Sequence, residues 1–234
     1  MRNNEKSNFL YIKNIFESIS NEYDFMNDLM TFKNHSKWKE EIVEIAIDSS
    51  PKKILDIATG TGDIAIKLSK IKGSIIDAVD VSDNMLKIAH NKIDKLNINN
   101  INLKTCEAEN LVFDDNQFDI ISIGYGVRNF TNLTKGLSES YRVLKNNGKL
   151  IILETSIPEN RIIKLLYSLI TTIYIPIIAF IFSRKTKAYL YLLDSTKNFP
   201  PRKKFFEILK KIGFKKVETR KKLYGASTIY IASK

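Results

Sequence analysis

The sequence predicts an α/β fold in which a doubly wound, mostly parallel sheet of seven strands is joined to an N-terminal helical cap and to a helical insertion after the fifth strand. Short β-branched runs alternate with stretches of helical periodicity between residues 53 and 154, which is typical of βαβ units. A glycine-rich turn follows the first run, and two further β-branched runs end the chain. Together these features predict one Rossmann-like domain over residues 1–234.

Residues 1–50 are expected to form the helical cap. Apolar residues recur near a 3.6-residue period from Phe9 to Ile19 and again from Trp38 to Ala46, which predicts two helices. The stretch Asn21–His35 between them is expected to be irregular.

Residues 51–155 are expected to form the ligand-binding core. The predicted strands are Lys53–Ala58, Ser74–Val79, Ile101–Cys106, Phe118–Ile123 and Lys149–Glu154. The predicted helices are Asp63–Lys70, Asn84–Leu96 and Leu133–Leu144. The last of these helices is followed by Asn147 and Gly148, a common signal for a helix end.

Residues 156–212 do not continue this alternation of strands and helices and are expected to form an apolar and basic helical lid. Arg161–Phe182 is helical and very apolar, whereas the helix predicted over Pro201–Ile212 is polar. The final strand pair, within residues 213–234, is expected at about Lys216–Lys221 and Ser227–Ala232.

Composition restricts the class of protein. The chain has 234 residues, of which 44% are hydrophobic and 27% charged, so a packed core is expected rather than a disordered chain. One cysteine, Cys106, and two histidines argue against an intrachain disulfide and a structural zinc site, and we expect no metal. The polar N-terminus resembles no signal peptide, so a reducing cytoplasm is the expected compartment.

A net charge of +11 favours anionic partners or a solvated lysine-rich surface. Methyltransferases that act on amino groups of nucleic-acid bases usually carry an Asn/Asp/Ser-Pro-Pro-aromatic motif after the fourth strand. Here that place reads Gly124-Tyr-Gly-Val. We therefore expect no nucleic-acid partner.

The glycine-rich turn is the first candidate binding site. The segment from Asp56 to Gly62 lies between a predicted strand and a predicted helix, and Asp80 ends the next strand. Glycines at this place let backbone N–H groups and a helix N-terminus approach a ligand, and a carboxylate can accept hydrogen bonds from ribose hydroxyls. A plain turn with a solvated Asp is the alternative reading. Gly60, Gly62 and Ala65 also satisfy the dinucleotide fingerprint, so an NAD-dependent dehydrogenase stays open.

Several motifs spread over nearly the whole chain are more specific than this turn. They are Phe16–Met30 with Tyr-Asp-Phe-Met-Asn-Asp at its centre, His35, Trp38, Asp56–Asp63, Asp80–Met85, Gly124–Asn129, Tyr141–Lys145, Leu153-Glu154, Asp194-Ser195, Asn198–Pro200 and Gly213-Phe214. In these motifs the chain resembles the ubiquinone/menaquinone biosynthesis C-methyltransferases, which are class I methyltransferases.

The resemblance implies S-adenosylmethionine as methyl donor, S-adenosylhomocysteine as product and a prenylated quinol as acceptor. The expected reaction converts demethylmenaquinol to menaquinol, and C-methylation of the benzoquinol intermediate of ubiquinone biosynthesis is the alternative. The expected donor-binding residues are Asp56, Gly60, Thr61, Gly62, Asp80, Val81, Met85, Glu107, Ala108 and Gly124.

Three positions depart from the family pattern. Glu107 stands where Asn or Asp is usual, although a carboxylate can still accept from an adenine amine. Gly124 stands where the family usually has Ser, so that one hydroxyl contact is lost or replaced. Ala58 stands where many methyltransferases have Gly.

The expected catalytic residues are Arg128, Asn129, Tyr23 and Asp24. A ring carbon is a poor nucleophile until a neighbouring phenol loses its proton, so the site needs a cation or donor near that oxygen. Arg128, with Asn129, follows the fourth strand and is expected to hold the oxygen. Tyr23 is expected to face the ring, and Asp24 to act as a base through water. The alternative is that Tyr23 to Asp28 only dock the cap onto the core.

The lid is also a candidate membrane segment. Leu165–Phe182 contains 18 residues without charge, a borderline length for a span. Pro176 interrupts it, and strands of one sheet lie on both sides of it, so an interfacial helix or a buried lid fits better than a crossing. The basic residues flanking it are Arg161, Lys164, Arg184, Lys185 and Lys187. They favour peripheral contact of residues 161–187 with the anionic cytoplasmic leaflet.

Other questions stay open at this level. A different small-molecule methyltransferase or a non-catalytic quinone-binding scaffold are further alternatives, because a fold does not determine a function. The sequence leaves open whether the protein forms a homodimer, what prenyl tail length the acceptor has and which group is the general base.

Overall fold

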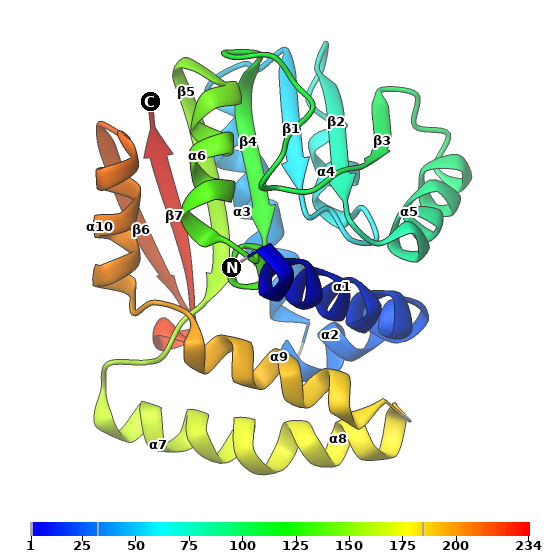
Figure 1. The fold of residues 1–234 in the computed structure, drawn as a ribbon, viewed down its shortest axis with the longest axis vertical. Coiled ribbons are helices and arrows are strands. Elements are labelled where there is room, and N and C mark those ends of the chain that lie inside the picture. Colours follow the sequence, from blue (N-terminus) through cyan, green and yellow to red (C-terminus); the bar gives the residue numbers. More distant parts are fainter. Residues whose placement is uncertain (1, 32, 184) are drawn as a thin grey trace.

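Seven strands form one sheet in the order β3-β2-β1-β4-β5-β7-β6 (Figure 1). The computed structural model describes residues 2–31, 33–183 and 185–234. The strands are β1 Lys53–Ile57, β2 Ile75–Asp80, β3 Ile101–Thr105, β4 Phe118–Gly124, β5 Leu144–Thr155, β6 Lys216–Lys222 and β7 Ser227–Ser233. β7 is antiparallel to both of its neighbours, and the other neighbouring pairs are parallel. The predicted doubly wound, mostly parallel sheet is confirmed.

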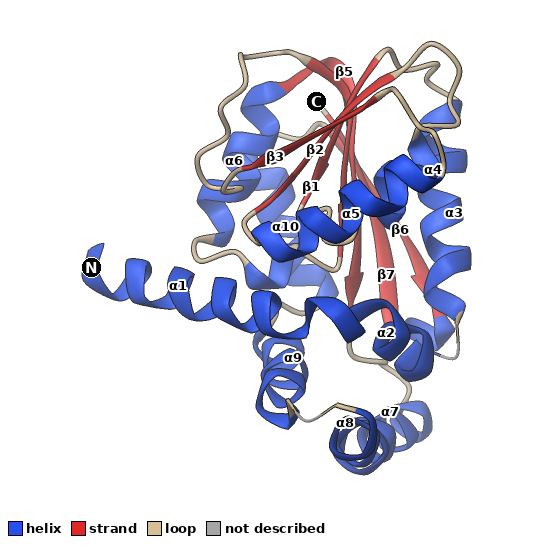
Figure 2. Ribbon diagram, turned by 90° about the vertical axis from the view of Figure 1, so that its right-hand side faces the viewer, coloured by secondary structure: helices blue, strands red, loops and turns tan. Residues whose placement is uncertain are grey.

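Helices cover both faces of the sheet (Figure 2). The α-helices are α1 Arg2–Ile19, α2 Tyr23–Thr31, α3 Asn34–Ile47, α4 Asp63–Leu68, α5 Asp83–Lys95, α6 Leu133–Val143, α7 Arg161–Leu169, α8 Ile175–Phe182, α9 Thr186–Asn198 and α10 Arg202–Ile212. The shorter helical segments are η1 Ser20–Glu22, η2 Val127–Asn129, η3 Ile170–Tyr174 and η4 Leu223–Gly225. One apolar core packs α6 and α10 on the sheet, and a second packs α3 and α4 on the opposite face.

Two local predictions need correction. The stretch expected to be irregular between the cap helices contains α2, whose Met26 is completely buried. The helix expected to reach Leu144 ends at Val143, because Leu144 already pairs with Phe118 as the first residue of β5. Strand pairing therefore overrides the helix-end signal at Asn147 and Gly148.

The cap and the lid pack together at the carboxyl ends of the strands (Figure 1). A third apolar cluster joins α1, α2, α5, α8 and α9, with Ile19, Met26, Met85, Ala179 and Tyr189 among its buried members. In a doubly wound sheet the ligand binds at this end. The helices outside the sheet therefore enclose the place where the site is expected.

Candidate active site

The turn after β1 is tied to Asp80 at the end of β2. One carboxylate oxygen of Asp80 accepts a hydrogen bond from the Gly60 N–H at 2.8 Å, and the other accepts from the Ser82 N–H at 2.9 Å. Burial raises the pKa of Asp80, although the backbone donors oppose that shift. The carboxylate thus sets the shape of two loops at once, and it also faces the cavity described below.

The same turn requires left-handed backbone at three positions. Ala58, Gly60 and Gly62 have φ values of 54°, 57° and 84°. A Cβ on Gly62 would lie 3.0 Å from the Cβ of Ala89 in α5, so this glycine serves close packing of α4 against α5. Ala58 accepts a conformation that costs an L-residue about 1 kcal/mol.

Asp56 lies beneath the turn instead of facing the cavity. It is buried in β1 and accepts hydrogen bonds from the hydroxyls of Thr59 and Ser122, both at 2.6 Å. Burial raises its pKa to about 6, against the opposing effect of the two hydroxyls. In this geometry Asp56 braces β1 against β4.

A cavity of about 690 Å³ opens against this turn. Six of the predicted donor-binding residues line it, namely Gly60, Asp80, Val81, Met85, Ala108 and Gly124. We call it the donor cavity. Its buried carboxylate and apolar walls suit the ribose and the adenine of S-adenosylmethionine. The predicted catalytic residues Tyr23 and Asn129 also line it.

The other predicted donor-binding residues lie outside this cavity. Asp56 and Gly62 support the turn, Thr61 faces a second cavity, and Glu107 is exposed. Glu109, two residues further along the chain, lines the donor cavity.

α1 contributes a wall of the donor cavity that no sequence motif indicated. Phe9, Ile12 and Phe16 close the donor cavity from the cap side. Their helical spacing was recognised as apolar periodicity, but nothing in that pattern distinguishes a residue that packs on a ligand from one that packs on protein.

A second cavity, of about 1340 Å³, lies between the core, the cap and the lid. We call it the acceptor cavity. It shares Tyr23, Ala58, Gly60, Gly124 and Tyr125 with the donor cavity, so the two spaces meet at the carboxyl ends of β1 and β4. Its remaining wall is mixed, with Arg128 and His35 on one hand and lid residues such as Ile170 and Ile175 on the other. Two ligands, one bound in each cavity, would therefore lie next to each other at these shared residues.

The side chain of Arg128 is only 8% exposed at the edge of the acceptor cavity, and it is already paired. Its Nη1 donates to Glu154 Oε1 at 2.6 Å and to the Tyr125 carbonyl at 3.0 Å, and its Nε donates to Ser195 Oγ at 3.3 Å. The Glu154 carboxylate raises the pKa of Arg128 more than enough to offset the effect of burial. The cation predicted from the sequence is therefore present beside the acceptor space.

The two predicted cap residues are placed differently. Tyr23 lines both cavities, and burial raises the pKa of its phenol. Asp24 lines neither cavity. It accepts from Thr61 Oγ1 at 2.6 Å and pairs with Lys92 at 2.5 Å, which joins α2 to the turn before α4 and to α5. This geometry favours docking of the cap as the role of Asp24.

Solved structures share the fold of this chain. A crystal structure of a SAM-dependent methyltransferase from Thermotoga maritima superposes with a TM-score of 0.65 over 94% of this chain and 99% of that one, at 20% identity. Another, from Methanococcus maripaludis, gives a TM-score of 0.61 over 88% and 90% at 24% identity. At this identity they share the fold. The donor cavity lies at the carboxyl ends of the strands, the ligand-binding end of that fold.

The sequence comparisons are more specific. The family model described as ubiE/COQ5 methyltransferase family matches residues 2–234, and the chain belongs to that family. A demethylmenaquinone methyltransferase from Chlorobaculum tepidum is 39% identical over 95% of this chain and 92% of its own length. A ubiquinone/menaquinone biosynthesis C-methyltransferase from Blochmanniella floridana is 37% identical over 95% and 89%. The resemblance found in the sequence motifs is thereby confirmed.

Proposed function

We propose that this chain transfers a methyl group from S-adenosylmethionine to a ring carbon of a prenylated quinol, converting demethylmenaquinol to menaquinol. The observation that carries the proposal is the wall shared by the two cavities, where Tyr23, Gly124 and Tyr125 face both spaces. The relative from Chlorobaculum tepidum is named for this reaction. The relative from Blochmanniella floridana is named for both quinone pathways, which supports the benzoquinol intermediate of ubiquinone biosynthesis as the second candidate acceptor.

The residues of the site have separate tasks in this proposal. The bound donor supplies an electrophilic methyl group with a good leaving group, so the protein must orient the ring and exclude water. Arg128 stabilises the quinol oxygen as it loses its proton, because a buried cation lowers the pKa of a neighbouring phenol. Tyr23 lies where the two cavities meet and orients the ring toward the donor, and Asn129 lines the donor cavity next to Arg128.

Methyl transfer from labelled S-adenosylmethionine tests the proposal directly. The purified protein is incubated with reduced demethylmenaquinone, and in parallel with the demethylated benzoquinol. Labelled menaquinol is the expected product, and label in the benzoquinol alone would establish the second candidate. Calorimetry with S-adenosylhomocysteine and with NADH is the control, since binding of NADH alone would contradict a methyltransferase.

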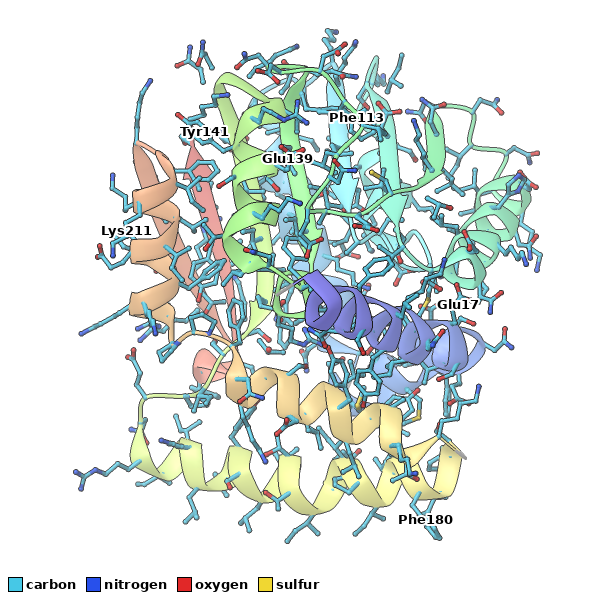
Figure 3. All side chains as sticks on the ribbon, in the orientation of Figure 1. Glu17, Phe113, Glu139, Tyr141, Phe180 and Lys211 are labelled. Carbon is cyan, nitrogen blue, oxygen red and sulfur yellow. The ribbon has the colours of Figure 1, made fainter. Side chains whose placement is uncertain are left out.

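We further propose that α7, η3 and α8 lie on the cytoplasmic leaflet of a membrane. Residues 161–182 form a helical segment long and apolar enough to span a bilayer by length and composition, yet only 11% of its most apolar window is buried. Its exposed apolar side chains, between 48% and 77% exposed, are Ile162, Leu165, Leu166, Leu169, Ile173, Ile177, Phe180, Ile181 and Phe182. Figure 3 shows Phe180 pointing away from the rest of the protein.

A helix that covers a water-soluble core usually keeps its exposed face polar, and this segment does not. Tyr167 and Thr171 face the acceptor cavity together with Ile170 and Ile175, whereas most of the exposed side chains of the segment are apolar. Exposed Arg161, Lys164 and Lys187 flank the segment, and cations at these places attract an anionic leaflet; Arg184 lies outside the described residues.

The segment also begins and ends on one side of any bilayer. β5 before it and β7 after it pair along their length in one sheet, so an interfacial orientation fits and a crossing does not. In this position the lid would open the acceptor cavity toward the membrane, where a prenylated quinol resides.

Co-sedimentation with vesicles tests membrane contact. We expect binding to vesicles with 30–40% anionic lipid, on the order of a tenfold gain over neutral vesicles, and loss of binding in Phe180→Ser/Ile181→Ser. The matched control is Leu96→Ser, at an exposed apolar residue on the far side of the core. Equal binding by the lid variant and the wild type would contradict the proposal.

A further inference from the structure

Glu154 is a fully buried carboxylate near the end of β5. Its Oε1 accepts from Arg128 Nη1 at 2.6 Å, from the Thr155 N–H at 2.7 Å and from Thr155 Oγ1 at 3.1 Å. Its Oε2 accepts from the backbone N–H of Arg128 at 3.3 Å. The carboxylate therefore holds both the backbone and the side chain of Arg128, but it does not itself line the acceptor cavity.

The hydrogen bonds of Arg128 leave one edge of its guanidinium open. An arginine side chain has five N–H donors. Two on Nη1 are taken by Glu154 and the Tyr125 carbonyl, and the one on Nε is taken by Ser195 of α9. The two on Nη2 meet no acceptor among the described residues. Because Arg128 lines the acceptor cavity, this free edge is the part available to a ligand.

We propose that Glu154 is the positioning residue that holds Arg128 with its Nη2 edge toward the acceptor, with Ser195 as a secondary support. The inference rests on the proposed function, since it assigns the free edge to the quinol oxygen. Without the Glu154 carboxylate, burying the charged guanidinium here would cost free energy, and the side chain would turn toward solvent. The buried counter-charge keeps it in the cavity. Because the guanidinium is planar, holding its Nη1 and Nε atoms also fixes the direction of the two N–H groups on Nη2.

The test compares Glu154→Ala with Glu154→Gln. Glutamine keeps an acceptor oxygen for Nη1, whereas alanine removes it. We expect kcat of the Ala variant to fall about 100-fold, the loss typical of a misplaced catalytic group. The Gln variant is expected to remain within about tenfold of the wild type. Affinity for S-adenosylhomocysteine is expected to stay within about twofold in both, because the donor cavity lies on the other side of the shared wall.

Two further variants separate positioning from folding. Glu139→Gln is the matched control, because Glu139 pairs with Arg142 at 2.8 Å away from both cavities; its kcat is expected to be unchanged. Ser195→Ala removes the second support without leaving a buried charge, and about a fivefold fall in kcat is expected. This variant decides the question if Glu154→Ala does not fold.

A measurement without substrate keeps the inference distinct from the proposed function. In protein with labelled arginine, the Nε–H resonance of Arg128 is expected to exchange slowly with solvent in the wild type and rapidly in Glu154→Ala. Unchanged exchange, a Gln variant no better than Ala, or a parallel loss of donor affinity would each overturn the positioning role. A wild type that methylates no quinol but shows the expected exchange would overturn the proposed function alone.

Discussion

The donor cavity and the acceptor cavity adjoin each other but are built in different ways. The donor side is made by loops after consecutive strands, in which the backbone N–H groups of Gly60 and Ser82 are fixed by one carboxylate. The acceptor side is made by side chains from α2, α3, α9 and the lid, which come from distant parts of the chain. The turn side of the donor cavity therefore depends on local backbone chemistry, whereas its α1 wall and the acceptor cavity depend on how helices pack.

Arg128→Ala is expected to show the largest effect, and only on the acceptor side. Loss of the buried cation removes stabilisation of the quinol oxygen, so turnover should fall about 1000-fold, equivalent to about 4 kcal/mol. Affinity for S-adenosylhomocysteine should be unchanged by calorimetry.

Arg128→Lys is the control for this variant. Removal of Arg128 leaves Glu154 buried without its partner, which costs about 3–5 kcal/mol of stability. A lysine keeps the charge but has no planar fork, so it should fold well and still turn over slowly. A parallel loss of donor affinity in either variant would show that the two cavities are not separable.

Asp80→Ala is expected to act on the opposite side. The carboxylate holds Gly60 and Ser82 and faces the donor cavity, so its removal should weaken binding of S-adenosylhomocysteine about 300-fold. Asp80→Asn keeps one acceptor oxygen, so its affinity for S-adenosylhomocysteine should fall less than that of Asp80→Ala. Turnover at saturating donor should fall far less than affinity; if turnover alone falls, Asp80 does not belong to the donor side.

The donor side could be predicted from the sequence more fully than the acceptor side. The strand order, the turn at Gly60 and the carboxylate at Asp80 follow from local patterns, because a βα turn and its neighbouring strand end are fixed by the sheet. Glu154 was noted only as part of a motif, since its pairing with Arg128 across 26 residues is visible only after β4 and β5 lie side by side. The paired roles of Asp24 and Lys92 depend in the same way on the docking of the cap.

Asp56→Asn is expected to change stability without changing either ligand site. The folded-state pKa of Asp56 is raised from 3.8 to about 6, so the native state keeps a proton that the unfolded chain releases. Its contribution to stability is therefore present at low pH and is lost as the pH rises from about 4 to about 6. Asparagine has no such titration, and the variant should gain on the order of 2 kcal/mol over the wild type between pH 4 and pH 7. Urea unfolding of both proteins at several pH values measures this difference, and parallel curves would contradict the assignment.

Gly124→Ala tests the shared wall and should give the smallest effect. A Cβ at this position would lie 2.3 Å from the Cδ1 atom of Ile64, so Ile64 occupies the space that a side chain at residue 124 would need. The end of an isoleucine can move, and the expected cost is about 1 kcal/mol of stability with a few-fold loss of donor affinity. Ile64→Val removes Cδ1, and the double variant should recover most of both losses. If the double variant is no better than Gly124→Ala alone, the glycine is needed for the backbone or for the donor itself, and the space filled by Ile64 does not explain why this chain has glycine there.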